Sequence, residues 1–163
     1  TFEGDIELPS LRNKFLTIGM AKVSTSAAEA FDLGFYKKGR DKYVVNQDRQ
    51  IAEAKMAVLD MASAGYTSPQ ERKDIRVLGR QGLGMVYAGA YTMYSGKYIS
   101  EHDKLISEKL GYVLCGGDLS SKTKVSETYL LNLEREAFLS LLGEKKTLER
   151  IQSILTTGKP LRN

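Results

Sequence analysis

SEHDKLISEKLGYVLCGG, residues 100–117, carries the signals of one complete helix. Ser100 and Asp103 form an S-x-x-acid capping box at its start, and Gly116 with Gly117 ends it. Between these signals, apolar residues recur every three or four positions, at Leu105, Ile106, Leu110, Val113 and Leu114. The stretch therefore predicts an amphipathic helix that buries one face.

Helical patterns of the same kind recur along most of the chain, whereas strand signals are sparse. Ser26 and Glu29 form a second capping box, which begins a short helical hook closed by Gly34. Asp48 is placed to cap a helix that Gly65 ends. Besides the hook, the predicted helices span 10–21, 48–65, 83–98, 100–115, 126–143 and the stretch that Gly158 ends, with strand-like runs at 43–45 and 75–78. The sequence thus predicts a mainly α protein of about six helices with minimal strand.

The composition indicates a single domain over residues 1–163. Of the 163 residues, 42% are hydrophobic, and the net charge is +4. A chain of this length buries roughly 70% of its unfolded surface. Charges or glycines interrupt every apolar run before the roughly 18 residues that a membrane span needs. With Cys115 alone, nothing requires an oxidising compartment, so we expect a cytoplasmic location. The start at Thr1, without a basic and apolar leader, favours a piece or processed product of a longer protein.

Positive charge is concentrated in two short zones. Residues 35–49 and residues 144–163 each carry five Lys or Arg against two Asp or Glu. Two separate zones suit a discrete anionic ligand better than the continuous stripe that binds duplex nucleic acid. A solvated surface explains them equally well. Nucleic-acid binding is therefore only a third hypothesis, favoured by nothing but the sequence pI near 9.1.

The sequence contains no complete group of residues for a catalytic site or a metal site. His102 is the single histidine, and its place between two acids in a first helical turn predicts an exposed capping segment. Cys115 lies in an apolar helix end, where a thiol is typically an inert small hydrophobe. Gly79, Gly82 and Gly84 follow a strand-like run, but the third glycine and second strand of a dinucleotide-binding unit are missing. We therefore expect no catalytic residue and no metal ligand.

Four tyrosines occupy one side of the predicted helix at 83–98. The spacings of four, three and four place all of them on one face: Tyr87, Tyr91, Tyr94 and Tyr98. The favoured interpretation is a helix packed against its neighbours with the hydroxyls at the rim, because aromatic stripes usually belong to cores or interfaces. An aromatic platform for a base or ring remains the functional alternative.

Residues 24–35, STSAAEAFDLGF, resemble the I-S-A-x-E-A-x-x-x-G-L-V segment of the crotonase (enoyl-CoA hydratase/isomerase) superfamily. The helix from Asp48 matches the next helix of that superfamily in place and pattern. The far end is similar too, since EREAF at 134–138, TLERI at 147–151 and GKP at 158–160 look like its closing helices and their Lys-Pro tail.

Three further segments point to a narrower group. ISEHD at 99–103, VLCGGD at 113–118 and TGKPLRN at 157–163 look like the carboxyl end of bacterial multifunctional 3-hydroxyacyl-CoA dehydrogenases with a C-terminal crotonase region. The resemblance implies that residues 1–163 are the helical C-terminal region of a fatty-acid β-oxidation enzyme. It divides them into crotonase-like helices at 1–65, an extra helical segment at 66–124 and closing helices at 125–163.

The resemblance also implies where chemistry and ligands belong. The catalytic groups and the NAD site of such a parent lie upstream, so the fragment alone is expected to be inactive and to hold no cofactor. The closing helices of the family fold over the acyl-CoA site, which would place Phe138 near the acyl or pantetheine path. Lys159 would lie near the CoA phosphates, a task that suits its compact cation.

The expected partners follow from the same resemblance. They are acyl-CoA, bound through the parent, and the upstream domains of the same chain, with a homo-oligomer as an open possibility and without nucleic acid or a membrane span. The alternative function, from a different class, is a non-enzymatic helical interaction module that docks a protein partner through the face of Tyr87, Tyr91, Tyr94 and Tyr98.

Overall fold

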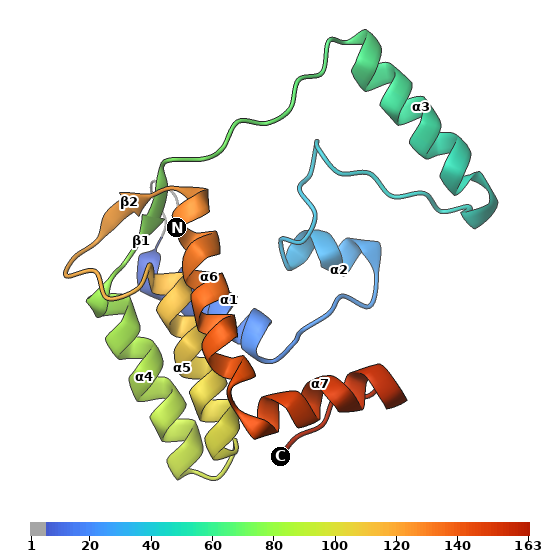
Figure 1. The fold of residues 1–163 in the computed structure, drawn as a ribbon. Coiled ribbons are helices and arrows are strands. Elements are labelled where there is room, and N and C mark those ends of the chain that lie inside the picture. Colours follow the sequence, from blue (N-terminus) through green and yellow to red (C-terminus); the bar gives the residue numbers. More distant parts are fainter. Residues whose placement is uncertain (1–5) are drawn as a thin grey trace. The chain divides into compact units, whose positions relative to one another are not determined.

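The computed structural model describes residues 6–163, so the first five residues of the predicted ranges 1–163 and 1–65 lie outside it. The described chain is mainly helical, with helices α1 to α7 and one two-stranded sheet (Figure 1), which confirms the predicted fold class. It divides into two units. Unit 1 combines the residues up to 21 with residues 71–163, and unit 2 comprises residues 22–70.

Unit 1 is built around two adjacent helices, α4 (Arg80–Ser95) and α5 (Glu101–Cys115). They run antiparallel, with α1 (Glu7–Gly19) packed against both and α6 (Glu127–Leu142) against α5 (Figure 1). Helix α7 (Lys145–Thr157) follows α6 and contacts it. The buried cluster at the centre consists of Leu11, Leu78, Leu83 and Cys115.

Gly111 lets α4 and α5 approach closely. A Cβ atom at this position would lie within 3.0 Å of two side-chain atoms of Val86 on α4. Real side chains essentially never come so near, so the spacing of the two helices depends on the missing side chain. The pairing in turn buries Val86 and Ala90 of α4.

The small sheet joins two distant parts of unit 1. Strands β1 (Ile75–Val77) and β2 (Thr123–Val125) pair antiparallel, with Ile75 opposite Val125. Gly79 then begins α4 with φ +57°, a conformation that side chains disfavour. Because the strands are antiparallel and no other strand within residues 6–163 joins their sheet, β1 and α4 do not form the βαβ unit of a dinucleotide-binding fold.

Unit 2 contains the helical hook α2 (Ala27–Asp32), a short 3₁₀ turn (Gln47–Arg49) and α3 (Gln50–Ser63). The Ser26 hydroxyl accepts a hydrogen bond from the Glu29 amide at 3.1 Å, as the capping box predicts. The Glu29 carboxylate reaches back to Thr25 rather than to Ser26. Gly34 follows α2 with φ +77°, which confirms the predicted end of the hook.

The helix predicted at 48–65 differs from α3 in its cap and in its burial. Asp48 does not cap α3, whose N-cap residue is Arg49 and makes no side-chain cap hydrogen bond. Asn46 instead caps the 3₁₀ turn before α3, since its side chain accepts from the Asp48 amide at 3.0 Å. The predicted apolar face, with Ile51 and Val58, is exposed, and α3 has no buried residue. Periodicity identifies the face that a helix can bury, but not the surface that covers it. The strand-like run at 43–45 forms no strand.

Candidate functional site

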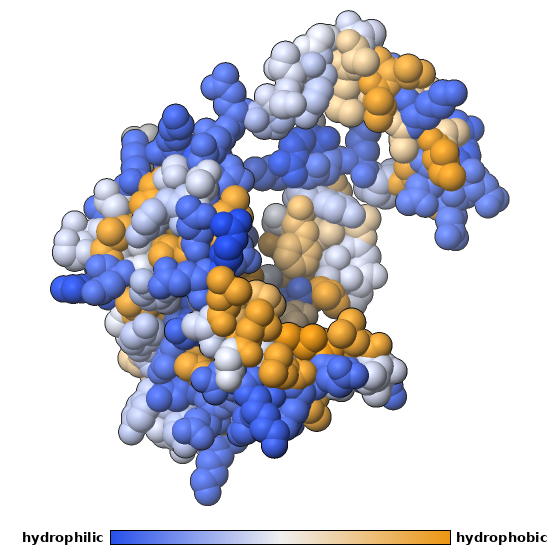
Figure 2. All heavy atoms as spheres, in the orientation of Figure 1, coloured by the Kyte–Doolittle hydropathy of each residue, from blue (hydrophilic) through white to orange (hydrophobic). Residues whose placement is uncertain are grey.

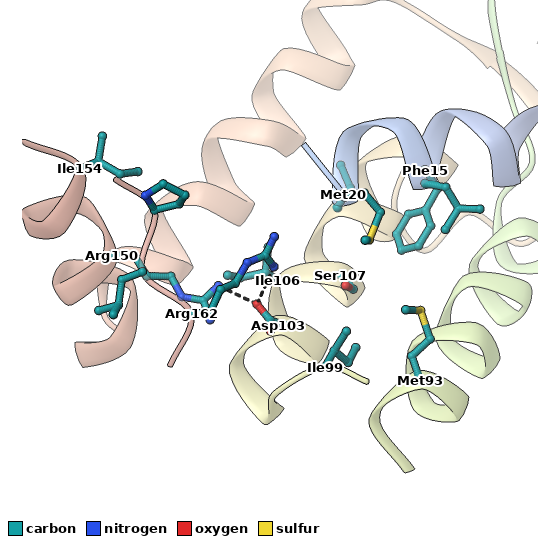
Figure 3. A pocket seen from close by; sticks show the side chains of 15 residues that line it. Phe15, Met20, Met93, Ile99, Asp103, Ile106, Ser107, Arg150, Ile154 and Arg162 are labelled. Atoms are coloured by element: carbon teal, nitrogen blue, oxygen red, sulfur yellow. Dashed lines mark hydrogen bonds and ion pairs between the residues drawn. The ribbon is translucent and has the colours of Figure 1, made fainter. Parts of the chain in front are cut away.

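A cavity of about 220 Å³ lies in unit 1 where four helices and the C-terminal tail meet. Helix α1 contributes Phe15, and α4 contributes Met93. Figure 3 shows Phe15 and Met20 facing Met93, with Ile106 and Ser107 of α5 nearby. The wall is largely apolar; it also includes Leu16, Gly19, Ile99, Leu110, Ile154, Pro160 and Leu161. Such a wall holds apolar groups by removing them from water.

The cavity has one charged end, formed by Asp103, Arg150 and Arg162 (Figure 3). The capping box of α5 positions Asp103, whose carboxylate accepts from the Ser100 amide at 3.2 Å. The other carboxylate oxygen accepts from Arg150 at 2.7 Å. Burial acts to raise the pKa of Asp103, but the hydrogen bonds from Arg150 and Ser100 outweigh it and lower that pKa. The carboxylate is therefore charged at neutral pH and already paired.

Arg150 also holds the C-terminal tail against α7. Its Nε donates to the side-chain oxygen of Asn163 at 2.8 Å, and another guanidinium nitrogen donates to the Asn163 backbone at 3.1 Å. Asn163 in turn donates to Glu149 at 2.7 Å. The Ser153 hydroxyl donates to the backbone oxygen of Lys159 at 3.0 Å. These bonds fix the tail residues that close one side of the cavity.

A second hollow of about 760 Å³ adjoins the first. The two share Met20, Met93, Ile99, Asp103 and Arg162. The second adds two aromatic rings and another cation, from Tyr94, Tyr98 and Lys97. The apolar cavity therefore continues into a more open hollow with aromatic and positively charged side chains.

The two residues that the resemblance assigned to acyl-CoA do not line this cavity. Phe138 lies on α6 with 51% of its surface exposed, and Lys159 lies in the exposed tail after α7. Figure 2 shows apolar side chains at the surface over α6 and α7; those that are exposed include Leu131, Phe138, Leu139, Leu148, Ile154 and Leu155. Phe138 is thus part of an open apolar surface, and its proposed contact with an acyl group stays a prediction.

The tyrosine face of α4 is exposed rather than packed. Tyr87, Tyr91 and Tyr94 are exposed. Tyr98, 81% exposed, lies beyond α4, which ends at Ser95 rather than at residue 98 as predicted. The ammonium group of Lys104 lies 5.8 Å from the ring centre of Tyr91 and 5.7 Å from that of Tyr94. Both distances suit a cation–π contact. The buried residues of α4 are instead small or aliphatic. The expectation of a packed aromatic stripe was therefore wrong.

The expectation of an exposed His102 was also wrong. Only 4% of its surface is exposed, because α7 packs over it and the Thr147 hydroxyl lies 3.0 Å from its Nε2 atom. Burial lowers the pKa of His102, and the positive charges of Arg150 and Lys146 act in the same direction. The partner of the ring is the buried Thr147 hydroxyl, so His102 joins α5 to α7.

Cys115 is buried, which confirms that it behaves as a small hydrophobe. Burial raises the pKa of its thiol to about 11. The residues from 6 onward contain no group of three or more His, Cys, Asp or Glu that could hold a metal ion. The described helices include none that is both long enough and apolar enough to cross a membrane.

The chain is similar to a known bacterial protein. Over 149 residues, the chain is 46% identical to the "Probable 3-hydroxyacyl-CoA dehydrogenase" of Bacillus subtilis (strain 168). The aligned region covers 91% of this chain but only 19% of that protein, so the chain spans about a fifth of the relative's length. No protein-family model matches the chain. No solved structure matches it significantly.

Proposed function

We propose that the chain is the helical C-terminal region of a longer enzyme of fatty-acid β-oxidation, related to 3-hydroxyacyl-CoA dehydrogenases. The identity of 46% over nearly the whole chain carries this proposal. The segments at 99–103, 113–118 and 157–163 resemble the carboxyl end of such enzymes, which supports the same placement. The crotonase-like assignment of the segment STSAAEAFDLGF belongs to the proposal as well.

Within that enzyme, this region binds and packs rather than catalyses. Its histidine is buried and its thiol has a raised pKa. The NAD site and the groups that hydrate an enoyl-CoA or oxidise a 3-hydroxyacyl-CoA therefore belong to the rest of the longer protein. Phe138 and Lys159 would contact the acyl-CoA, as the resemblance implies. The longer enzyme would be located in the cytoplasm.

The exposed apolar helices support a packing role. Helix α3 has no buried residue, although Ile51, Met56, Val58 and Leu59 lie on it. A helix that is apolar around most of its circumference is normally covered in a folded protein. Upstream domains of the same polypeptide, or a second copy, would cover such a helix.

Turnover measurements test the proposed function directly. The 163-residue chain alone should neither hydrate crotonyl-CoA nor reduce NAD with 3-hydroxybutyryl-CoA. A longer polypeptide that includes the region should do both, and deletion of the region should impair it. Turnover by the chain alone would contradict the assignment of catalysis to the rest of the protein.

A binding measurement tests the predicted role of Lys159. Lys159→Ala should weaken CoA binding to the longer polypeptide several-fold, because a charge-assisted contact to phosphate is lost. Lys124→Ala, which removes an exposed cation from β2, is the matched control. Equal CoA affinity of both variants and the parent would remove Lys159 from the site.

A protein-interaction module remains a second candidate, favoured by the exposed tyrosines of α4. Tyrosine combines a large apolar ring with a polar tip, and interfaces are enriched in it. Light scattering after size-exclusion chromatography should then show self-association that Tyr91→Ser with Tyr98→Ser abolishes. A monomer at every concentration would contradict a docking face for a second copy.

A further inference from the structure

The two adjoining hollows of unit 1 form one groove with an apolar inner part and a charged outer part. The inner part lies among Phe15, Met20, Met93 and Leu110, and the outer part carries Tyr94, Lys97, Tyr98 and Arg162. Shared lining residues, including Ile99, make the two parts continuous. A ligand that spans the groove must therefore be apolar at one end and polar at the other.

The charge of the outer part favours an anion. Asp103 is the acid of the groove, and Arg150 already neutralises it at 2.7 Å. Arg162 lies 3.5 Å from the same carboxylate, and 61% of its side chain is exposed. Its guanidinium can therefore still donate to a ligand, as can the ammonium of the exposed Lys97.

The inner part suits a flexible chain. Its volume of about 220 Å³ is below the ~300–1,000 Å³ of most pockets for drug-sized ligands. Two of its wall residues, Met20 and Met93, are unbranched and adapt readily to the shape of a guest. Ser107 places a single hydroxyl among these apolar side chains (Figure 3), which could bond to one carbonyl or hydroxyl oxygen of the guest.

We propose that this groove binds the acyl thioester of a phosphorylated carrier, with the acyl chain between Met20 and Met93 and the anionic carrier beside Lys97 and Arg162. The inference rests on the proposed function, which supplies the class of ligand. It places that ligand in the groove, away from Phe138. A free fatty acid shares the apolar chain and the negative end. It lacks the phosphates that would reach the outer part.

The methionines of the chain provide an internal control for the test. With methyl-¹³C methionine in the 163-residue chain, octanoyl-CoA should shift the NMR signals of Met20 and Met93. It should leave those of Met56 and Met61 in place, because these two lie exposed on α3 and report any non-specific binding of the acyl chain. CoA alone should shift Met20 and Met93 less than octanoyl-CoA does, because it lacks the acyl chain that would lie between them, and octanoate should shift them only at much higher concentration.

Two variants separate the inner part from the outer part. Ser107→Phe, which fills the cavity, should weaken octanoyl-CoA binding at least about tenfold, whereas Ser63→Phe on α3 should not. Lys97→Ala with Arg162→Ala removes surface charge without touching the core, so it tests the proposal even if Ser107→Phe unfolds. This double variant should weaken octanoyl-CoA binding more than octanoate binding, because octanoate lacks the phosphates that would reach Lys97 and Arg162.

The outcomes separate this proposal from the proposed function. If octanoyl-CoA binds but Met20 and Met93 do not respond, the groove is not its site, and acyl-CoA binding by the region still stands. If the folded chain binds none of the probes, the groove proposal fails. The place of the region in a dehydrogenase is then decided by turnover of the longer polypeptide with and without it.

Discussion

The Nε2 atom of His102 lies 3.0 Å from the hydroxyl oxygen of Thr147, a hydrogen bond that joins α5 to α7 across 45 residues of sequence. Both residues are buried. Because α7 carries the tail that closes the candidate cavity, this bond helps to position one wall of the site. The contact therefore links the stability of unit 1 to the shape of its cavity.

The first prediction concerns pH. Burial lowers the pKa of His102 below its ordinary value of 6.5, with Arg150 and Lys146 adding to the effect and Glu144 and Asp103 opposing it. The unfolded chain thus binds this proton more readily than the folded one. The stability that His102 contributes is present above about pH 6.5 and is lost as the pH falls through the folded value. Urea unfolding at about pH 7.5 and about pH 5 should show this loss, and His102→Gln should reduce it. An unchanged pH dependence in that variant would contradict the prediction.

The second prediction isolates the hydrogen bond itself. Thr147→Val keeps the shape of the side chain but leaves His102 without its partner, so it should lower the free energy of unfolding by about 1–3 kcal/mol. Thr156→Val on the same helix removes an exposed hydroxyl and should stay within about 0.5 kcal/mol of the parent. Equal effects of the two substitutions in denaturant titrations would show that the buried bond is unimportant.

The third prediction concerns the close approach of α4 and α5. Gly111→Ala forces a methyl group against Val86 and should destabilise the fold by about 1–3 kcal/mol. Gly89→Ala on α4 meets open space, so it should be neutral or stabilise the fold by up to about 1 kcal/mol through higher helix propensity. Thermal unfolding of both variants tests this prediction. A Gly111→Ala variant as stable as the parent would show that α4 and α5 can move apart at little cost in free energy.

The fourth prediction concerns the tail. Arg150→Met leaves Asp103 partly buried without its main partner and releases Asn163, which should cost about 3 kcal/mol. Amide hydrogen exchange in residues 159–163 should accelerate at the same time. Arg162→Met removes an exposed and longer ion pair and should cost at most about 1 kcal/mol. Unchanged exchange in the tail of Arg150→Met would show that other contacts hold it.

The fifth prediction concerns Cys115. Its thiol is buried and has a pKa of about 11, so at about pH 8 it should react with Ellman's reagent far more slowly than a free cysteine. Reaction should become fast in denaturant. Rapid modification of the native chain would indicate that the cluster of Leu11, Leu78 and Leu83 opens easily.

Much of the helical architecture was predictable because its signals are local. Ser100 and Asp103 form the predicted capping box, and Gly116 ends α5 with φ +83°. A cap depends on atoms three residues apart, which the sequence places together by itself. The same holds for Ser126, whose hydroxyl accepts from the Tyr129 amide at 3.1 Å. The start of α1 at Glu7 rather than near residue 10 reflects the weaker signal there, since Ile6 has no side-chain cap.

The sequence by itself determined where most of the helices lie, through caps and periodicity. Only the tertiary structure decided that His102 is buried, that the tyrosines of α4 are exposed, and that Met20, Ser107 and Arg162 line one cavity. Local signals carry no information about which helix faces which, because that depends on the packing of residues far apart in the chain. The site is made of such distant residues, so it becomes visible only when α1, α4, α5 and α7 are assembled.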